Sequence, residues 1–143
     1  MGIDYSILAP GEADQAVALG GGRHPTTSLG TFRSIYDWIT ARAPECHPRD
    51  PDGIGIRIGE DTYATLYLKT ERPSFPRLAE EPNPPRDDEA IVEIYVDMRG
   101  EGPADYSLIA DLARHLNGVI FCGATSTVLT PRAWLQRSRG SGP

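Results

Sequence analysis

The sequence predicts an α+β fold, a two-layer sandwich in which helices cover one face of a mainly antiparallel sheet. Three observations support it: a β-hairpin pattern at residues 53–69, a second alternating segment at residues 90–98, and amphipathic helical patterns at residues 31–44 and 102–118. Strands that alternate with two main helices in this order are typical of a ferredoxin-like βαββαβ core. We expect that core to carry one extra strand.

The hairpin is the clearest pattern in the chain. In residues 53–69 (GIGIRIGEDTYATLYLK), hydrophobic residues alternate with small or polar ones on both sides of a Gly-Glu-Asp turn. This period of two places successive side chains on opposite faces of a sheet. Residues 90–98 alternate in the same way. We therefore expect the helices to cover one set of strand residues, namely Ala64, Leu66, Leu68, Val92, Ile94, Val96 and Met98.

Each of the two main helices has an apolar stripe and recognisable ends. The first has apolar residues at the i, i+3, i+4 and i+7 positions counted from Phe32. Thr31 can cap its start, and Pro44 ends it. The second has a similar stripe, and Asn117 followed by glycine supplies a left-handed stop. Both patterns predict helices that pack one face against the sheet.

Shorter elements complete the predicted order. They are strand 3–9, helix 11–19, a central strand 118–122 buried on both faces, strand 126–130 and a helical turn at 131–137. We expect residues 1–137 to form a single domain and residues 138–143 to form a frayed tail. Residues 71–90 are a Pro-rich, acidic connection of unusual length, which we interpret as a functional flap or a mobile excursion.

Charge and composition narrow the classes of partner. The formal net charge of −6 disfavours a protein that binds the phosphate backbone of nucleic acids, and it favours either a solvated surface or a basic partner. No apolar run approaches the roughly 20 residues that a membrane-spanning helix needs, so no membrane association is predicted. With only two cysteines in the chain, we expect a reduced, cytoplasmic protein.

Cys122 and the loop of residues 20–25 (GGGRHP) are the candidates for a small-molecule site or an enzyme. A catalytic thiol needs a base beside it, and His115 is predicted to point sideways or outward from the preceding helix. The loop lacks the spacing of a phosphate-binding loop, and adjacent Cys46 and His47 do not form a metal-ligand pattern. The residues favour a binding protein without cofactor or metal. An enzyme or small-molecule site at this loop and Cys122 stays as the alternative.

The sheet face that the helices leave open is the predicted binding surface. Tyrosines and acids alternate there with the core positions, and the neighbouring 71–90 connection adds further acids. Tyrosine offers a large, rigid contact area with a hydroxyl group, which suits binding surfaces. Any solvent-facing sheet also contains Tyr and polar residues, so plain solvent exposure is the alternative interpretation. The predicted partner-binding residues are Tyr63, Tyr67, Glu93, Tyr95, Asp97, Asp87 and Asp88.

Residues 111–129 (DLARHLNGVIFCGATSTVL), a helix that ends in Asn-Gly and leads to a short strand, resemble the C-terminal halves of small bacterial immunity proteins against polymorphic toxins. No functional residue is transferred from this resemblance. It implies a non-enzymatic, acidic protein that sequesters or neutralises a partner protein with a basic surface. The acidic residues of this chain would then pair with the cations of that partner. A homodimer through the tyrosine face is a further alternative.

Overall fold

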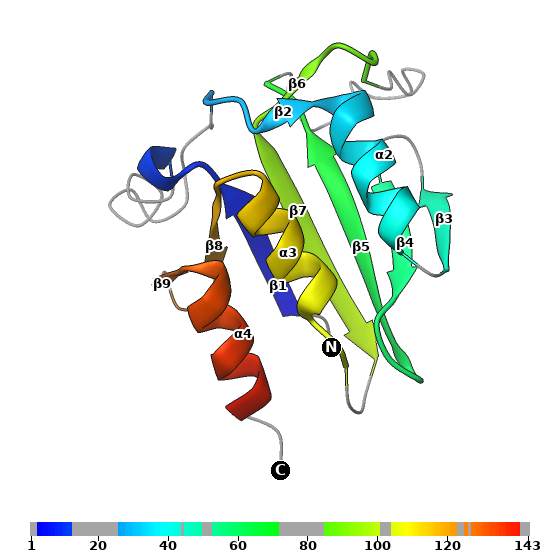
Figure 1. The fold of residues 1–143 in the computed structure, drawn as a ribbon, viewed down its shortest axis with the longest axis vertical. Coiled ribbons are helices and arrows are strands. Elements are labelled where there is room, and N and C mark those ends of the chain that lie inside the picture. The colour runs from blue at the N-terminus through cyan, green and yellow to red at the C-terminus, as the bar shows by residue number, and fades with distance from the viewer. Residues whose placement is uncertain are drawn as a thin grey trace, which may run out of the picture.

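The computed structural model describes residues 3–12, 26–43, 45–49, 53–71, 85–100, 104–122, 125 and 127–140. Its main feature is a seven-stranded antiparallel sheet (Figure 1). The strands are β1 (Ile3–Leu8), β3 (Cys46–Arg49), β4 (Gly53–Arg57), β5 (Thr62–Lys69), β7 (Glu93–Gly100), β8 (Val119–Cys122) and β9 (Thr127–Leu129). The longer helices are α2 (Phe32–Arg42), α3 (Ser107–His115) and α4 (Pro131–Gly140), and β2 (Gly30–Thr31) pairs with β6 (Ala90–Ile91).

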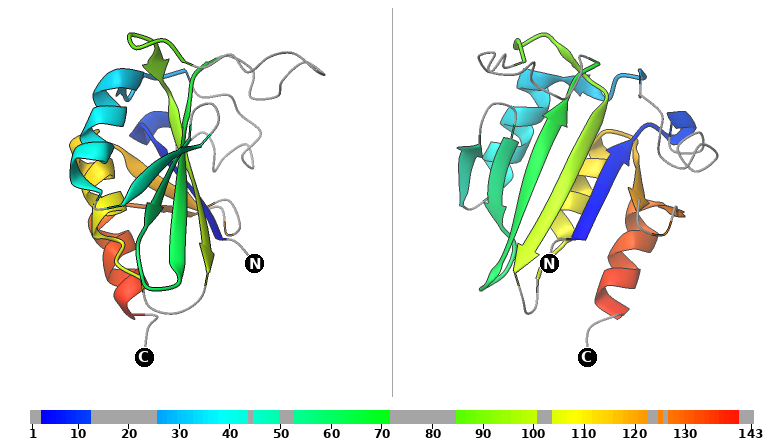
Figure 2. Two further views of the ribbon diagram at one scale, coloured as in Figure 1. Left: turned by 90° about the vertical axis from the view of Figure 1, so that its right-hand side faces the viewer. Right: turned by 180° about the vertical axis from the view of Figure 1, so that it is seen from behind.

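The three longer helices lie on the same face of the sheet. Figure 2, in its left panel, shows α2, α3 and α4 together on one side of the strands. The sheet order is β3-β4-β5-β7-β1-β8-β9, so β5, β7 and β1 occupy its middle. The predicted α+β class, with a mainly antiparallel sheet and helices on one face, is confirmed. The order of β5, β7, β1 and β8 is compatible with a ferredoxin-like core, and that finer description stays a prediction.

The hydrophobic core lies between sheet and helices because each strand turns every second side chain toward them. On β5, Ala64, Leu66 and Leu68 are buried, and the residues between them are partly or fully exposed. All seven strand residues that the sequence places in the core are buried. The helices contribute Phe32, Ile35, Ile39, Ile109, Ala110, Leu112, Ala113 and Trp134 to the same cluster.

The ends of the helices follow local sequence signals. The side-chain oxygen of Thr31 accepts a 3.3 Å hydrogen bond from the backbone nitrogen of Ser34, which confirms the predicted cap of α2. α3 begins later than the sequence predicts, at Ser107, whose backbone N–H donates a 2.9 Å hydrogen bond to the carboxylate of Asp105. Asn117 has a φ of 55°, the left-handed conformation expected of the residue that stops α3.

Several elements differ from the prediction or extend it. β8 is predicted as a central strand, but it lies second from one edge of the sheet, next to the edge strand β9. Its Ile120 and Phe121 are nevertheless buried in two different clusters, one on each face. β3 and the β2–β6 pair were not predicted; β3 contains Pro48, which is tolerated because this strand is at the sheet edge. α4 continues to Gly140, and most of the expected helix 11–19 lies outside the described residues.

Candidate functional site

The open face of the sheet is the side that α2, α3 and α4 do not cover, and the cross-strand register identifies its residues. Tyr63 is paired with Arg57 on β4 and with Arg99 on β7. Tyr67 is paired with Tyr95 on β7. Directly paired residues point to the same face of a sheet. By this rule the open face includes Ser6, Arg57, Tyr63, Thr65, Tyr67, Lys69, Glu93, Tyr95, Asp97 and Arg99.

The three predicted tyrosines lie on this face and differ in exposure. The rings of Tyr67 and Tyr95 have centroids 6.1 Å apart and are tilted by 35°, so they form a cross-strand aromatic pair. The ammonium nitrogen of Lys69 lies 5.6 Å from the centroid of the Tyr67 ring. Both paired tyrosines are half-buried, whereas Tyr63 is 49% exposed. The structure therefore presents one protruding aromatic side chain beside a flatter aromatic pair.

Two acidic residues of the open face with described side chains are held in place by neighbours. The hydroxyl of Ser6 on β1 donates a 2.6 Å hydrogen bond to Oε2 of Glu93 on β7. Oδ2 of Asp97 accepts a 3.2 Å hydrogen bond from Nε of Arg99. Oδ1 of Asp97 is buried and has no hydrogen-bond partner within the described part of the chain. These carboxylates are fixed in orientation before any partner arrives.

Cations surround the exposed Tyr63. Arg57 donates to the backbone oxygens of Gly59 and Glu60, both at 3.0 Å, which fastens it to the hairpin turn. Arg99 has a side chain that is 70% exposed, and Asp97 is its ion-pair partner. The described side chains of the open face thus include three cations and two acids. The described part of this face is therefore mixed in charge, whereas the sequence predicts an acidic surface.

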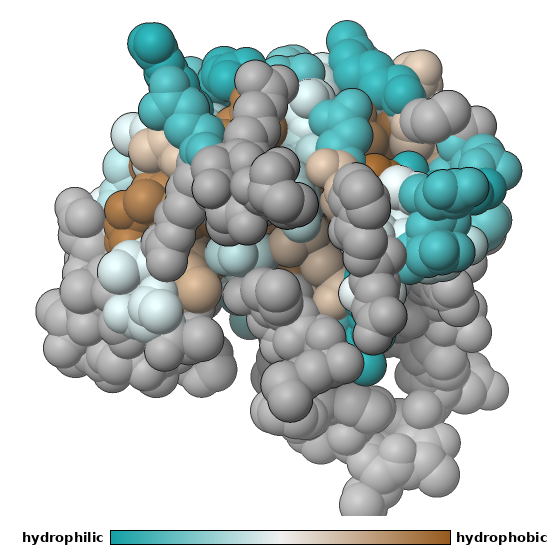
Figure 3. Space-filling model, turned by 90° about the horizontal axis from the view of Figure 1, so that it is seen from below, coloured by the Kyte–Doolittle hydropathy of each residue, from teal (hydrophilic) through white to brown (hydrophobic). Residues whose placement is uncertain are grey.

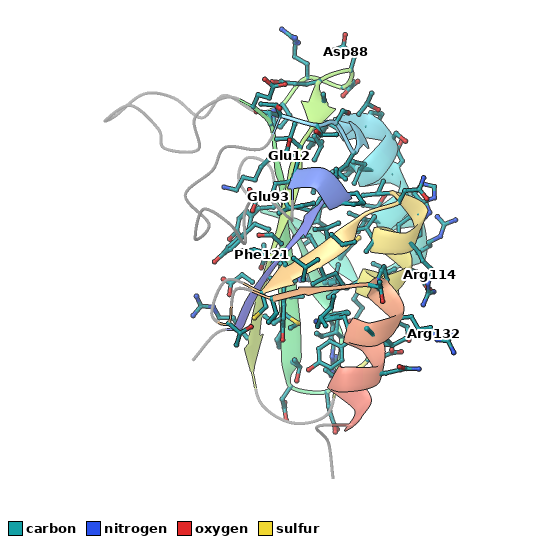
Figure 4. The ribbon with its side chains drawn as sticks, turned by 90° about the vertical axis from the view of Figure 1, so that its left-hand side faces the viewer. Glu12, Asp88, Glu93, Arg114, Phe121 and Arg132 are labelled. Carbon is teal, nitrogen blue, oxygen red and sulfur yellow. The ribbon has the colours of Figure 1, made fainter. Side chains whose placement is uncertain are left out.

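Asp87 and Asp88 lie away from the tyrosines, near the N-terminal end of α2. Asp87 forms a 3.2 Å ion pair with Arg33 of α2, and Asp88 forms a 3.7 Å ion pair with Arg86. Arg33 donates hydrogen bonds to both Asp37 and Asp87. These bonds, the one to Asp37 most strongly, raise the pKa of the Arg33 guanidinium above its usual value. Figure 4 shows Asp88 at one end of the molecule and Glu93 further along the sheet. The seven predicted residues therefore belong to two separate surfaces.

A small apolar cluster on the open-face side of the sheet was missed by the sequence analysis. Leu8 and Phe121 are buried in it, and Val119 and Val128 are packed against them (Figure 4 labels Phe121). The signal was present in β8, because Val119 and Phe121 are separated by a single residue and so share a face. We had interpreted the whole apolar run as one central strand. The cluster extends the open face towards β9 with packed hydrophobic side chains.

The residues of the alternative site are only partly described. Cys122 has a free thiol and is half-buried at the end of β8, where it is paired with Thr127 of β9. The loop 20–25 lies outside the described residues. Across the described chain, no group of three or more His, Cys, Asp or Glu side chains is arranged to hold a metal ion. Among the described residues, no hydrogen bond joins the Cys122 thiol to a His, Asp or Glu side chain that could act as its base.

Comparisons of the chain with protein-family models, with curated proteins and with solved structures found no match. No helix in the described ranges combines the length and the apolar character required to cross a membrane. We therefore infer the function from the geometry of the open face itself.

Proposed function

We propose that this protein is a non-enzymatic binding protein that docks a partner protein on the open face of its sheet. The exposure of Tyr63 is the observation that carries the proposal. At 49% exposure, Tyr63 is the one large hydrophobic residue that the described chain leaves exposed. It lies on the face of the sheet that α2, α3 and α4 do not cover. Tyrosine and arginine are enriched among the residues that dominate binding energy, and Tyr63 has Arg99 directly opposite it.

The rest of the open face supports a binding surface because its side chains already contact one another. Tyr67 and Tyr95 lie in contact range of each other, and the Ser6 hydrogen bond fixes Glu93. Side chains that are ordered before binding lose little conformational entropy when a partner docks. A face of this kind presents a flat aromatic area with one protruding ring, which suits a protein surface.

The charge of the chain favours a basic partner at long range. The net charge is −6, and the exposed Glu60 and Asp61 lie in the hairpin turn next to Tyr63. Opposite net charges accelerate association, and the effect falls as salt is added. Close to Tyr63, Arg57 and Arg99 provide positive charge, so we expect the partner to present residues of both signs there.

The partner class that we propose is a toxin that the protein neutralises in the cytoplasm. The resemblance of residues 111–129 to bacterial immunity proteins supports this class. A protein that covers a toxin's substrate-binding surface needs a preformed face rather than catalytic groups. The open face offers such a surface, with Tyr63 at its exposed end.

The test begins with the products of the neighbouring genes. Each product is purified and titrated with this protein by calorimetry at low and moderate salt. We expect one of them to bind, with a Kd that rises at least about tenfold in the Tyr63→Ala variant, the loss typical of a central tyrosine. Tyr36→Ala is the matched control, because Tyr36 is a half-buried tyrosine on α2 in the helix layer. Circular dichroism verifies that both variants are folded.

A second readout addresses neutralisation. If the bound product is toxic when expressed alone, co-expression of the wild-type protein is expected to restore growth, and co-expression of the Tyr63→Ala variant is not. Equal binding by wild type and Tyr63→Ala, or the absence of binding by every neighbouring product, would contradict the proposal.

A further inference from the structure

The last part of the chain differs in charge from the rest. Residues 112–143 contain four arginines and no Asp or Glu, although the whole chain has a net charge of −6. Two of these arginines have described side chains: Arg114 in the last turn of α3 and Arg132 in the first turn of α4. Figure 4 shows both on the helix side of the molecule, pointing away from the sheet. The two described arginines of this segment therefore lie on the outer side of the helix layer.

α2 adds an aromatic and cationic group to the same layer. The rings of Trp38 on α2 and His115 on α3 are stacked, with centroids 5.1 Å apart and planes inclined by 19°. The guanidinium carbon of Arg42 lies 4.2 Å from the centroid of the Trp38 ring. The stack joins α2 to the last turn of α3, which also contains Arg114. We call Trp38, Arg42, Arg114, His115 and Arg132 the basic helix face.

Much of this charge is not neutralised by the described chain. Arg114 is paired with Asp111 at 2.8 Å. Arg42 contacts the ring of Trp38 and donates a 3.2 Å hydrogen bond to the Trp38 backbone oxygen, and neither contact removes its charge. Arg132 is exposed and forms no ion pair with any described residue. Two guanidinium groups are thus available to an anionic ligand.

Stabilisation of helix ends does not explain the whole arrangement. Arg42, Arg114 and His115 lie in the last turns of α2 and α3, where a cation offsets the negative end of the helix dipole. Arg132, in contrast, lies in the first turn of α4, where the dipole is already positive and no acidic residue is present. A cation in that position costs helix stability, and an external anion would offset this cost.

We propose that the basic helix face is a second docking surface, distinct from the open face, and that its ligand is an acidic segment of a protein. Guanidinium groups match carboxylates in fork geometry, so Arg42 and Arg132 can each hold one Asp or Glu side chain. A single-stranded nucleic acid fits less well, because its bases need free aromatic surface and the Trp38 ring is already in contact with His115 and Arg42. Figure 3 shows the molecule from below, where hydrophilic and hydrophobic residues are intermixed on the described part of the surface.

The probe for the test is a fluorescein-labelled peptide of about ten glutamates, titrated by anisotropy at low salt with the full-length protein. We expect binding that weakens as salt is added. Arg42→Gln and Arg132→Gln should each weaken it about threefold or more, and the double variant should abolish it. Arg86→Gln is the matched control, because it removes the same charge from an exposed arginine near the N-terminal end of α2. The control should bind like the wild type.

A second measurement uses the indole of Trp38. The chain has two tryptophans, so Trp134→Phe leaves Trp38 as the sole emitter. We expect the peptide to change the emission of Trp38 in this background. An unlabelled oligothymidine of about ten nucleotides is the competing ligand, expected to bind more weakly than the peptide. The proposal is overturned if the peptide does not bind, if Arg86→Gln weakens binding as much as Arg132→Gln does, or if the oligonucleotide binds as tightly as the peptide.

Discussion

Ser6 and Glu93 are 87 positions apart in the chain, and the Ser6 hydroxyl donates a 2.6 Å hydrogen bond to the Glu93 carboxylate. The bond joins β1 to β7 on the open face and fixes one of the acids proposed to meet the partner. Neither residue belongs to a recognisable motif. The contact exists because β1 and β7 are antiparallel neighbours in the middle of the sheet.

Replacement of Ser6 by alanine tests this contact. We expect the free energy of unfolding to fall by about 1–2 kcal/mol, because a partly buried carboxylate loses a charge-assisted hydrogen bond. Urea denaturation followed by circular dichroism measures the change. Ser34→Ala is the control, since Ser34 is exposed on α2, and its effect should stay within about 0.5 kcal/mol. A loss no larger for Ser6→Ala than for Ser34→Ala would show that the bond contributes nothing to stability.

Gly100 at the end of β7 should tolerate no side chain. Its φ is 108°, and a Cβ atom there would overlap the backbone oxygen of Asp61 in the β4–β5 turn. We expect Gly100→Ala to destabilise the fold by more than about 2 kcal/mol, from backbone strain together with the clash. Gly11→Ala is the paired control, because a Cβ on Gly11 would meet no atom within 4 Å. Comparable melting temperatures for the two variants would contradict this account of the turn.

Trp134 packs α4 against the rest of the molecule. Two substitutions distinguish the contribution of its buried ring from that of its indole N–H group. The residue is 1% exposed and makes edge-to-face contacts with Tyr5 at 5.5 Å and Tyr106 at 5.3 Å. Its indole nitrogen is buried without a described hydrogen-bond partner. We expect Trp134→Ala to cost about 3–5 kcal/mol, and Trp134→Phe distinctly less, since the phenyl ring leaves no donor unpaired. Thermal unfolding of both variants provides the comparison, and equal losses would mean that the nitrogen has a partner in solution.

Asn117 should be replaceable by glycine but not by alanine. The residue holds a φ of 55° directly after α3, and glycine adopts this conformation without steric cost. We expect Asn117→Gly to leave the free energy of unfolding within about 0.5 kcal/mol, and Asn117→Ala to lower it by about 1 kcal/mol. Chemical denaturation distinguishes the two. A tolerated alanine would imply that α3 continues past its present end.

Local sequence patterns predicted most of the helices and strands, but not which strands lie next to each other in the sheet. The alternation in residues 53–69 was sufficient for the β4–β5 hairpin, because a strand and its turn depend on adjacent residues. The same reasoning found the cap at Thr31 and the stop at Asn117. It did not find β3, whose proline disfavours a strand and whose pairing with β4 depends on the sheet edge being available.

The sequence predicted that three tyrosines share the open face, but it did not predict which charges lie beside them. Tyr63, Tyr67 and Tyr95 share a face, as the period of two required. The cations beside Tyr63 were not anticipated as a group, because Arg57 and Arg99 come from two strands that flank β5 only in the folded sheet. Asp87 and Asp88 were expected near the tyrosines, and the structure places them beside α2 because Asp87 pairs with Arg33 there. The basic helix face was missed as well, although the absence of acids after Asp111 was a readable signal.

Local sequence patterns specify which side chains of each strand and helix turn inward, because that depends on a period of two or 3.6 residues along one segment. They also predicted the cap of α2 at Thr31 and the stop of α3 at Asn117. The charges beside Tyr63, the hydrogen bond from Ser6 to Glu93 and the stacking of Trp38 on His115 follow instead from the packing of the whole chain. Those contacts join residues distant in the chain, and their partners are set by how strands and helices pack rather than by any local preference.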